Sequence, residues 1–228
     1  MRILLLVASW LGVILLPIVI TTSILTNLFF DASFYHAGQA KYDVQTVTGM
    51  APEQMDRVDQ GIVRFFAGTE SLPGALSAVG AQTDVFKQKE ILHMDDVRLI
   101  VRFIGELQIV SLVIFIAITG VSVVRWHRYG RAALSRALTY GALLTVALVI
   151  LTGILTYTSF DALFLTFHEV TFKNNFWELD PRTDHLIQMF PFGFWYDAML
   201  TLASRVLLVT LCLGACGVIL GRFERRRV

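Results

Sequence analysis

Four long apolar stretches constrain the fold of this chain more than any other feature. A helix needs about 20 mainly apolar residues to cross a bilayer. Four segments meet that length, at residues 3–25, 99–124, 138–157 and 198–220. Only 16% of the residues are charged, against about 25% in ordinary soluble domains. The sequence therefore predicts an all-α integral membrane protein, a single membrane domain over residues 1–228 with four transmembrane helices. The first stretch is too long for a signal peptide and has no small-residue cleavage site after it, so we expect it to be retained.

The arginine and lysine residues indicate how the chain is oriented in the membrane. The N-terminus, the short loop between the second and third spans, and the C-terminal tail together hold nine basic residues against one acid. The two long connections, 26–98 and 158–197, hold eight basic residues against sixteen acids. We therefore expect both termini in the cytoplasm and both long loops outside the cell membrane, where they would form an extracellular cap. No basic patch typical of nucleic-acid binding is visible.

The first outer loop contains two helical patterns. Pro52 followed by an acid is typical of a helix start, and apolar residues then recur at helical spacing, at Met55, Val58, Ile62, Phe65 and Phe66. This amphipathic helix could lie on the membrane surface or pack as part of the cap. The second pattern begins near Asp84 and continues through His93 into the second span.

The second outer loop is rich in aromatic residues, with ten between Phe160 and Asp197. Tyrosine and tryptophan gather at membrane interfaces as anchoring belts. Here the aromatic residues alternate with polar ones that include His168, Asn175 and Asp184. Two interpretations stay open, packing within a belt and cap or the lining of a site.

His93 and His168 are the strongest candidates for chemistry. They lie just outside the second and third spans, in loops that face the same side of the membrane. Imidazole exchanges protons near neutral pH, so two histidines at one depth suit general acid–base catalysis. Asp96 lies three residues after His93 and shares its helical face, where it could orient the ring. Taken alone, either histidine could instead make a structural hydrogen bond.

A zinc site is the competing chemistry for the two histidines. Asp96, Asp184 or His185 would complete the shell of ligands. The sequence contains no tightly spaced ligand motif such as H-E-x-x-H, so the metal site is the weaker interpretation and we expect no metal or other cofactor.

Several charged residues near the histidines allow a structural or a functional role. Asp180 precedes a proline, and Asp184 is a plausible helix N-cap. Arg98 or Arg102 could reach a lipid phosphate or a substrate carboxylate or carbonyl. Glu106 and Arg205 lie inside the second and fourth spans, where isolated charges are costly, so we predict that they form an ion pair.

These residues resemble the motifs of a known family. The run from His93 to Arg98 precedes one span, and a second set precedes the last span: Phe167-His168, Asn175-Phe176-Trp177, Leu179-Asp180-Pro181, Thr183-Asp184, Leu186-Ile187 and Pro191. Together with the number and order of the spans, they resemble the lipoprotein intramolecular transacylase family of bacteria. The resemblance implies a four-helix bundle with an extracellular cap and an active site where the cap meets the membrane.

The resemblance also implies an activity. Family members move the sn-2 acyl chain of a diacylglyceryl lipoprotein to the amino group of its N-terminal cysteine, which gives a lyso-form lipoprotein. The expected partners are thus a diacylated lipoprotein and membrane lipids. The catalytic histidines of the family fall on His93 and His168. The same motifs imply supporting or substrate-binding roles for Asp96, Arg98, Phe167, Asn175, Trp177, Asp180 and Asp184.

The residues fit acyl transfer without a covalent intermediate. Two histidines supply a base and an acid, and no serine or cysteine stands in a nucleophile-elbow context. We expect His93 to be the base and His168 the acid or carbonyl polariser, although the two roles could be exchanged. Two other functions stay open: an outer-leaflet hydrolase of lipid esters, and a non-catalytic membrane sensor or partner-binding protein.

Overall fold

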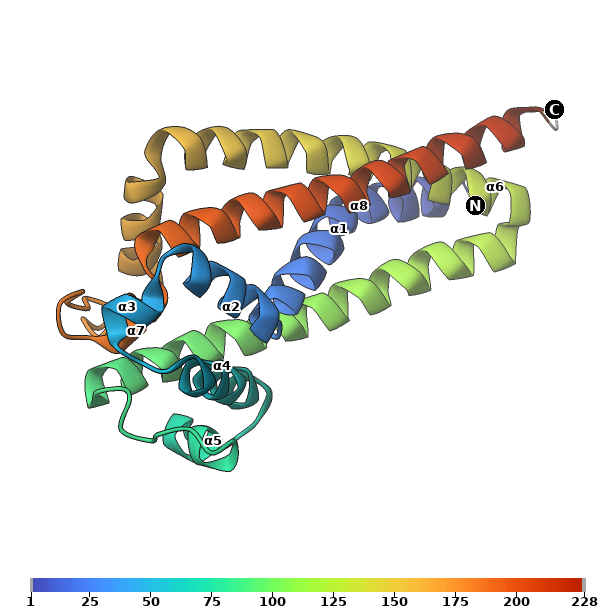
Figure 1. Cartoon of the computed structure of the whole chain (residues 1–228). Helices are drawn as coiled ribbons and strands as arrows, with labels where there is room; N and C mark the ends of the chain where they lie inside the picture. The colour runs from blue at the N-terminus through green and yellow to red at the C-terminus, as the bar shows by residue number, and fades with distance from the viewer. Residues whose placement is uncertain (1, 227–228) are drawn as a thin grey trace. The chain divides into compact units, whose positions relative to one another are not determined.

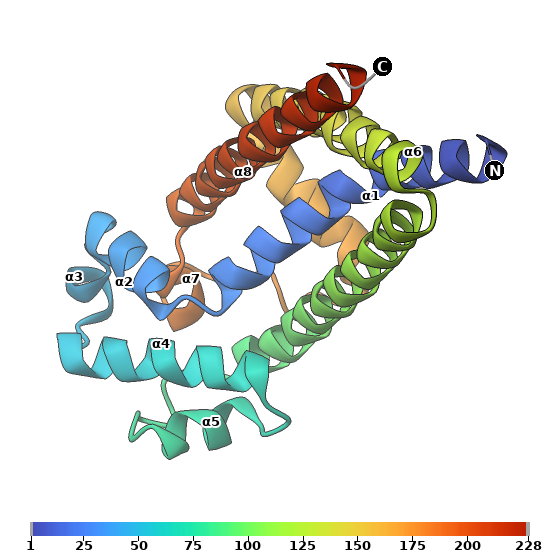
Figure 2. The same ribbon diagram turned by 90° about the vertical axis from the view of Figure 1, so that its right-hand side faces the viewer.

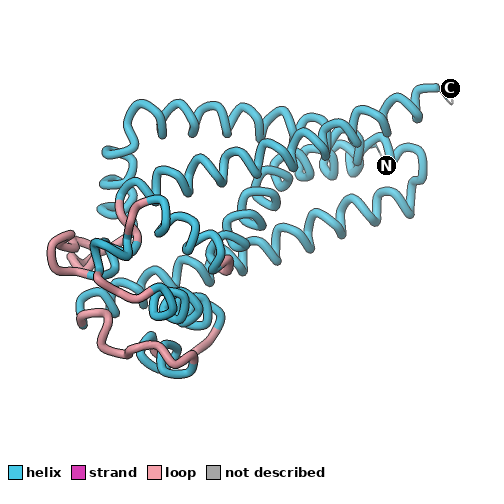
Figure 3. Tube along the Cα trace, in the orientation of Figure 1, coloured by secondary structure: helices cyan, strands magenta, loops and turns pink. Residues whose placement is uncertain are grey.

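The computed structural model describes residues 2–226, and every regular element in that range is a helix. The elements are α1 (Arg2–Phe29), α2 (Ala32–Lys41), α3 (Val44–Thr48), α4 (Pro52–Ala67), α5 (Leu72–Ala78), α6 (Gln88–Thr171), α7 (His185–Met189) and α8 (Phe192–Arg226). Figure 1 shows them in order along the chain, and Figure 3 shows the loops that join them. The all-helical fold class expected from the sequence is confirmed for these residues.

The chain divides into two compact units. The first, which we call the bundle unit, comprises Met1–Leu25, Ile104–Ile154 and Thr201–Val228. The second, which we call the site unit, comprises Thr26–Phe103 and Leu155–Leu200. The boundaries of the site unit lie within five residues of the two outer loops expected at 26–98 and 158–197.

Within the described residues, three helices are long and apolar enough to cross a membrane: Ile3–Phe29, Gln88–Thr171 and Phe192–Glu224. The longest, α6, has 84 residues, but the chain reverses within it (Figures 1 and 2). His127 has a φ of 44°, in the left-handed region, and a Cβ on Gly130 would lie 1.9 Å from the carbonyl oxygen of Ser122. Only glycine fits so close an approach. The expected spans 99–124 and 138–157 therefore lie on either side of this reversal.

Small residues bring the helices of the bundle unit together. A Cβ on Gly12 of α1 would lie 2.7 Å from that of Ala137, in the second arm of α6. On the same arm, the Ser135 hydroxyl donates a 2.8 Å hydrogen bond to the carbonyl of Gly217 in α8. Interfaces built from small residues are typical of membrane helices, where close backbone approach replaces hydrophobic driving force. The outward side chains of this unit are largely exposed leucine, isoleucine and valine, as expected for contact with lipid.

The ion pair predicted between Glu106 and Arg205 stays a prediction. Glu106 is exposed. Another ion pair joins α6 to α8, in which Nε of Arg131 lies 2.6 Å from Oε1 of Glu224. It joins the part of α6 just after the reversal to the C-terminal end of α8, and the Glu224 side chain is largely buried.

The site unit has its own hydrophobic core. The amphipathic helix expected from Pro52 is α4, and it packs its apolar face into the protein, since Val58, Ile62 and Phe65 are almost completely buried. Leu72 and Leu76 of α5 complete this face. The second expected helix begins at Gln88, four residues later than the pattern near Asp84 indicated.

Candidate functional site

His93 lies on the second turn of α6 and is almost fully buried, with 8% of its surface exposed. Its ring stacks edge to face on Phe172, with the ring centroids 5.0 Å apart. The buried Nδ1 makes no hydrogen bond to any described residue. A buried polar atom without a partner is costly in a folded protein, so this nitrogen is a candidate contact for a bound group.

His168 lies near the other end of the same helical element, 75 residues later in the sequence. Its ring centroid lies 6.1 Å from that of His93. The Nδ1 atom lies 2.7 Å from the carbonyl oxygen of Phe164, one turn earlier. Because a carbonyl oxygen only accepts hydrogen bonds, this contact requires a proton on Nδ1 and leaves Nε2 of the neutral ring as an acceptor.

Aromatic rings enclose this pair of histidines. The ring of Phe164 lies 4.3 Å from that of His168 between centroids, and the ring of Trp177 lies 5.1 Å away. Phe172 contacts both imidazoles, at 5.0 Å and 5.6 Å. Of the aromatic residues in the second loop, these lie at the histidines, so the site-lining interpretation applies to them.

Burial sets the protonation of both histidines. It lowers the pKa of His93 to about 4, and repulsion from His168 acts in the same direction. Asp96 opposes this shift but does not overcome it. Burial also lowers the pKa of His168, although the hydrogen bond to Phe164 partly offsets the effect. Both rings are therefore neutral at pH 7, when each can accept a proton.

Asp96 contacts the second loop and makes no hydrogen bond to His93. Its Oδ2 accepts a 2.8 Å hydrogen bond from the side-chain amide of Asn174. The Asn174 Oδ1 in turn accepts one from the backbone N–H of Phe176. Asp96 therefore holds the start of the loop rather than orienting the imidazole.

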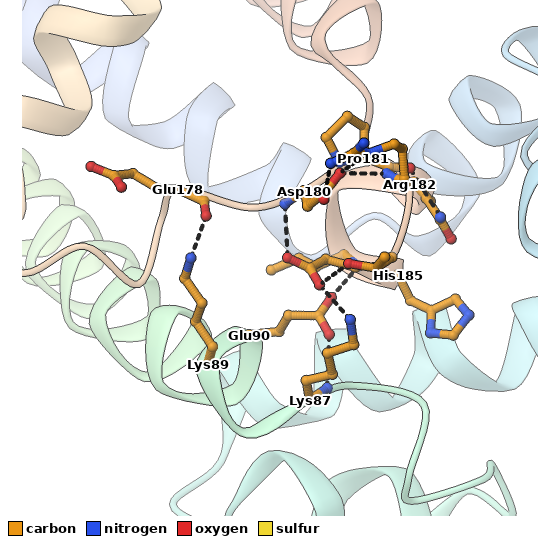
Figure 4. A network of polar contacts seen from close by, with 12 residues as sticks. Lys87, Lys89, Glu90, Glu178, Asp180, Pro181, Arg182 and His185 are labelled. Atoms are coloured by element: carbon orange, nitrogen blue, oxygen red, sulfur yellow. Dashed lines mark hydrogen bonds and ion pairs between the residues drawn. The ribbon is translucent and has the colours of Figure 1, made fainter.

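Asp180 and Asp184 belong to a polar network at the other end of the loop, and Figure 4 shows Asp180 within it. Asp184 accepts hydrogen bonds from Lys87 Nζ and from the backbone N–H of Asp180, both at 2.8 Å. Asp180 pairs with the exposed side chain of Arg182. Asp184 occupies the N-cap position of α7, as expected, but its side chain makes no capping bond there. Glu90 instead accepts the N–H of Leu186 at 2.6 Å.

The remaining candidates lie in different surroundings. Arg98 donates to the carbonyl of Glu70 and to Asp95, and its guanidinium lies over the ring of Phe65. Phe167 is half exposed, and its ring meets that of His168 edge to face at 5.2 Å. Asn175 is exposed. The structure thus groups Trp177 and Phe167 with the histidines, and it uses Asp96, Asp180 and Asp184 to hold the loop.

The zinc interpretation finds no matching cluster, since no three His, Cys, Asp or Glu residues within 2–226 are grouped to hold a metal. Asp184 contacts Lys87, and His185 contacts the carbonyl of Val85 at 2.8 Å. Sequence reasoning missed Glu90, and it did not distinguish Phe164 and Phe172 from the other aromatic residues of the loop. The spacing along the helix could have indicated two of these residues. Phe164 lies four residues before His168, and Glu90 lies three residues before His93, so each shares a helical face with its histidine.

Comparison with known proteins now supports the resemblance noted above. The model of the family described as lipoprotein intramolecular transacylase Lit matches residues 9–195. The chain belongs to this family.

Solved structures show the same fold. The membrane integral lipoprotein intramolecular transacylase Lit from Bacillus cereus superposes with a TM-score of 0.79 at 17% identity, over 99% of this chain and 97% of that one. A variant of that protein with one histidine replaced by arginine gives a TM-score of 0.72 at 16% identity, over 100% and 94%.

A curated relative from Aquifex aeolicus, an uncharacterised protein, is 31% identical over 118 residues. The match covers 52% of this chain and 50% of the relative, so it spans about half the length of each.

Proposed function

We propose that this chain is a lipoprotein intramolecular transacylase. It moves the sn-2 acyl chain of a diacylglyceryl lipoprotein to the amino group of the N-terminal cysteine and leaves a lyso-form lipoprotein. Membership of the Lit family supports this reaction. The observation that carries the proposal is the pair of buried histidines, with ring centroids 6.1 Å apart inside an aromatic enclosure.

The reaction conserves atoms without a co-reactant. The cysteine amine attacks the ester carbonyl, a C–N bond forms, and the bond from that carbon to the glycerol oxygen breaks. One proton passes from the amine nitrogen to the departing oxygen. Because both groups belong to one substrate, holding them in contact supplies much of the rate enhancement. Histidine can carry the proton between them.

The hydrogen bonding favours His168 as the base, the reverse of the assignment expected from sequence. Its Nδ1–H is committed to the Phe164 carbonyl, so Nε2 presents a lone pair to the substrate amine. His93, with a pKa of about 4, stays neutral through the reaction and donates its ring N–H to the carbonyl oxygen as negative charge develops there.

The supporting residues act on this pair from outside. Phe167 and Trp177 line the acyl and glycerol side of the site, and Asp96, Asp180 and Asp184 keep the loop closed over it. Arg98 and the exposed Asn175 contribute to holding the substrate or the cap. The proposed reaction uses no metal or other cofactor, because His168 carries the proton and His93 donates a hydrogen bond to the developing oxyanion.

The same proposal includes the membrane topology. The helices α1 and α8 each cross the bilayer once, and α6 crosses twice, with its reversal at His127 in the cytoplasm. Both termini are cytoplasmic, and the histidines face outward in an extracellular cap. The asymmetric distribution of basic residues supports this orientation. The partners are then a diacylated lipoprotein and the lipids of the bacterial cell membrane, with no nucleic acid.

Mass spectrometry of the N-terminal peptide tests the activity. A diacylated lipoprotein is incubated with the purified protein, with His93→Ala, with His168→Ala and with His36→Ala as a matched control, since His36 is an exposed histidine paired with Asp56. Acyl transfer to the cysteine amine at unchanged total mass, lost in the first two variants and kept in the third, is the expected result. Loss of one acyl chain would indicate a hydrolase, and no change with the wild-type protein would indicate a non-catalytic protein.

A further inference from the structure

Two carboxylates lie one helical turn on either side of His93. Glu90 precedes it by three residues and Asp96 follows it by three. Residues three apart on a helix share a face, and both carboxylates bind the same segment, residues 172–186. Asp96 binds it near its start through Asn174, and Glu90 binds it at its end through Leu186.

Glu90 is completely buried, and both of its oxygens are used. Oε2 accepts the backbone N–H of Lys87 at 2.7 Å, which caps the start of α6. Oε1 accepts the backbone N–H of Leu186 at 2.6 Å. Figure 4 shows Glu90 between the first turn of α6 and the loop. A single carboxylate thus joins two segments that are far apart in sequence, through charge-assisted hydrogen bonds.

The segment between these ties carries the rings that contact the histidines. Phe172 lies against both imidazoles, and Trp177 lies against His168. Lys89 adds a hydrogen bond to the carbonyl of Glu178 in the middle of the segment. Because an unsatisfied carboxylate or N–H in a buried site is unfavourable, loss of either tie would release the loop and let the ring of His93 shift relative to that of His168.

We propose that Glu90 and Asp96 are paired positioning residues that fix the His93 ring against His168 by tying residues 172–186 to α6 on both sides of His93. The inference rests on the proposed acyl transfer and adds residues to it. Neither carboxylate touches the reacting atoms. Their effect is on the separation of the two imidazoles, to which the rate is sensitive because displacements of about 1 Å can cost roughly a hundredfold.

Glu90→Gln tests the first tie, since the amide keeps the shape but provides only one acceptor oxygen. Asp59→Asn is the matched control, because Asp59 is an equally buried carboxylate of the site unit with contacts elsewhere. We expect kcat to fall at least about tenfold in Glu90→Gln with KM unchanged, and to stay at the wild-type value in Asp59→Asn. An equal fall in both variants would show that kcat responds to the loss of any buried carboxylate in the site unit and not to this tie, and it would overturn the proposal.

A charge swap tests the second tie. Asn174→Asp alone places a second carboxylate against that of Asp96, so the hydrogen bond is replaced by repulsion, and kcat should fall by a factor similar to that in Glu90→Gln. Adding Asp96→Asn places the amide at 96 and the carboxylate at 174, which allows the hydrogen bond to form again, and kcat should recover. Lys173→Ala, at an exposed position of the same segment, should leave kcat unchanged. Wild-type kcat in Glu90→Gln, or no recovery in the double variant, would refute the positioning role. Absence of product with the wild-type protein would instead refute the acyl transfer.

Discussion

Replacing Asp59 by asparagine should make the folded protein more stable at alkaline pH. Asp59 and Gln39 are both buried, with 2% and 0% of their surfaces exposed. Gln39 Nε2 donates to Asp59 Oδ1 at 2.7 Å, while Gln39 Oε1 and Asp59 Oδ2 have no partner. Two acceptors without a donor indicate a missing proton. A proton on the Asp59 carboxyl supplies a donor and relieves the charge.

The size of the effect follows from the pKa. Burial raises the pKa of Asp59 from 3.8 to about 7, the bond from Gln39 opposes this, and the charge of Asp56 adds to it. Each pKa unit corresponds to 1.36 kcal/mol. A shift of about three units is therefore on the order of 4 kcal/mol. The folded state binds the Asp59 proton more tightly than the unfolded state does. The resulting contribution to the free energy of unfolding is therefore fully present below pH 3.8 and is lost as the pH rises to about 7.

Asparagine removes the titration and keeps the shape, and its amide provides the donor that the pair lacks. The measurement is thermal or denaturant unfolding of both proteins in detergent, at pH 5 and at pH 8. The wild-type protein should lose stability between these values relative to Asp59→Asn, and the variant should be the more stable at pH 8. The half-exposed Asp56 on the same helix provides the control, since Asp56→Asn should change stability by less than about 0.5 kcal/mol. Equal pH dependence in the wild-type protein and Asp59→Asn would refute the reasoning.

Three further predictions concern the site and its frame. Burial lowers the pKa of both histidines, to about 4 for His93. We therefore expect kcat to stay constant as the pH falls through 6.5 and to decline only below that value. A fall in kcat centred at or above pH 6.5 would contradict this assignment. Chelator should leave acyl transfer unchanged, and activity lost to chelator and restored by zinc would favour a metal-dependent hydrolase. Gly38→Ala should lower the free energy of unfolding by about 1–3 kcal/mol, because the new Cβ would lie 2.4 Å from the Phe194 ring. Gly105→Ala is the control, and it should leave the free energy of unfolding unchanged because the space around Gly105 is open.

The length of the apolar runs and the spacing of charges determined much of this protein without a structure. The fold class and the helix beginning at Pro52 follow from local patterns that depend only on neighbouring residues. The two histidines were also identifiable, because each stands at the outer end of a predicted span. The pair predicted between Glu106 and Arg205 rests on similar depth in the membrane alone, which does not determine which faces of two helices meet.

Only the tertiary structure decided how the histidines are surrounded. The sequence assigned no role to Glu90, because that role depends on Leu186, 96 residues away. Asp96 shares a helical face with His93, yet it binds Asn174, 78 residues away. Such partners depend on the packing of segments that are distant in sequence, where burial and the need to satisfy every polar group select one arrangement. The sequence determined which residues have the chemistry, and the packing determined which of them meet.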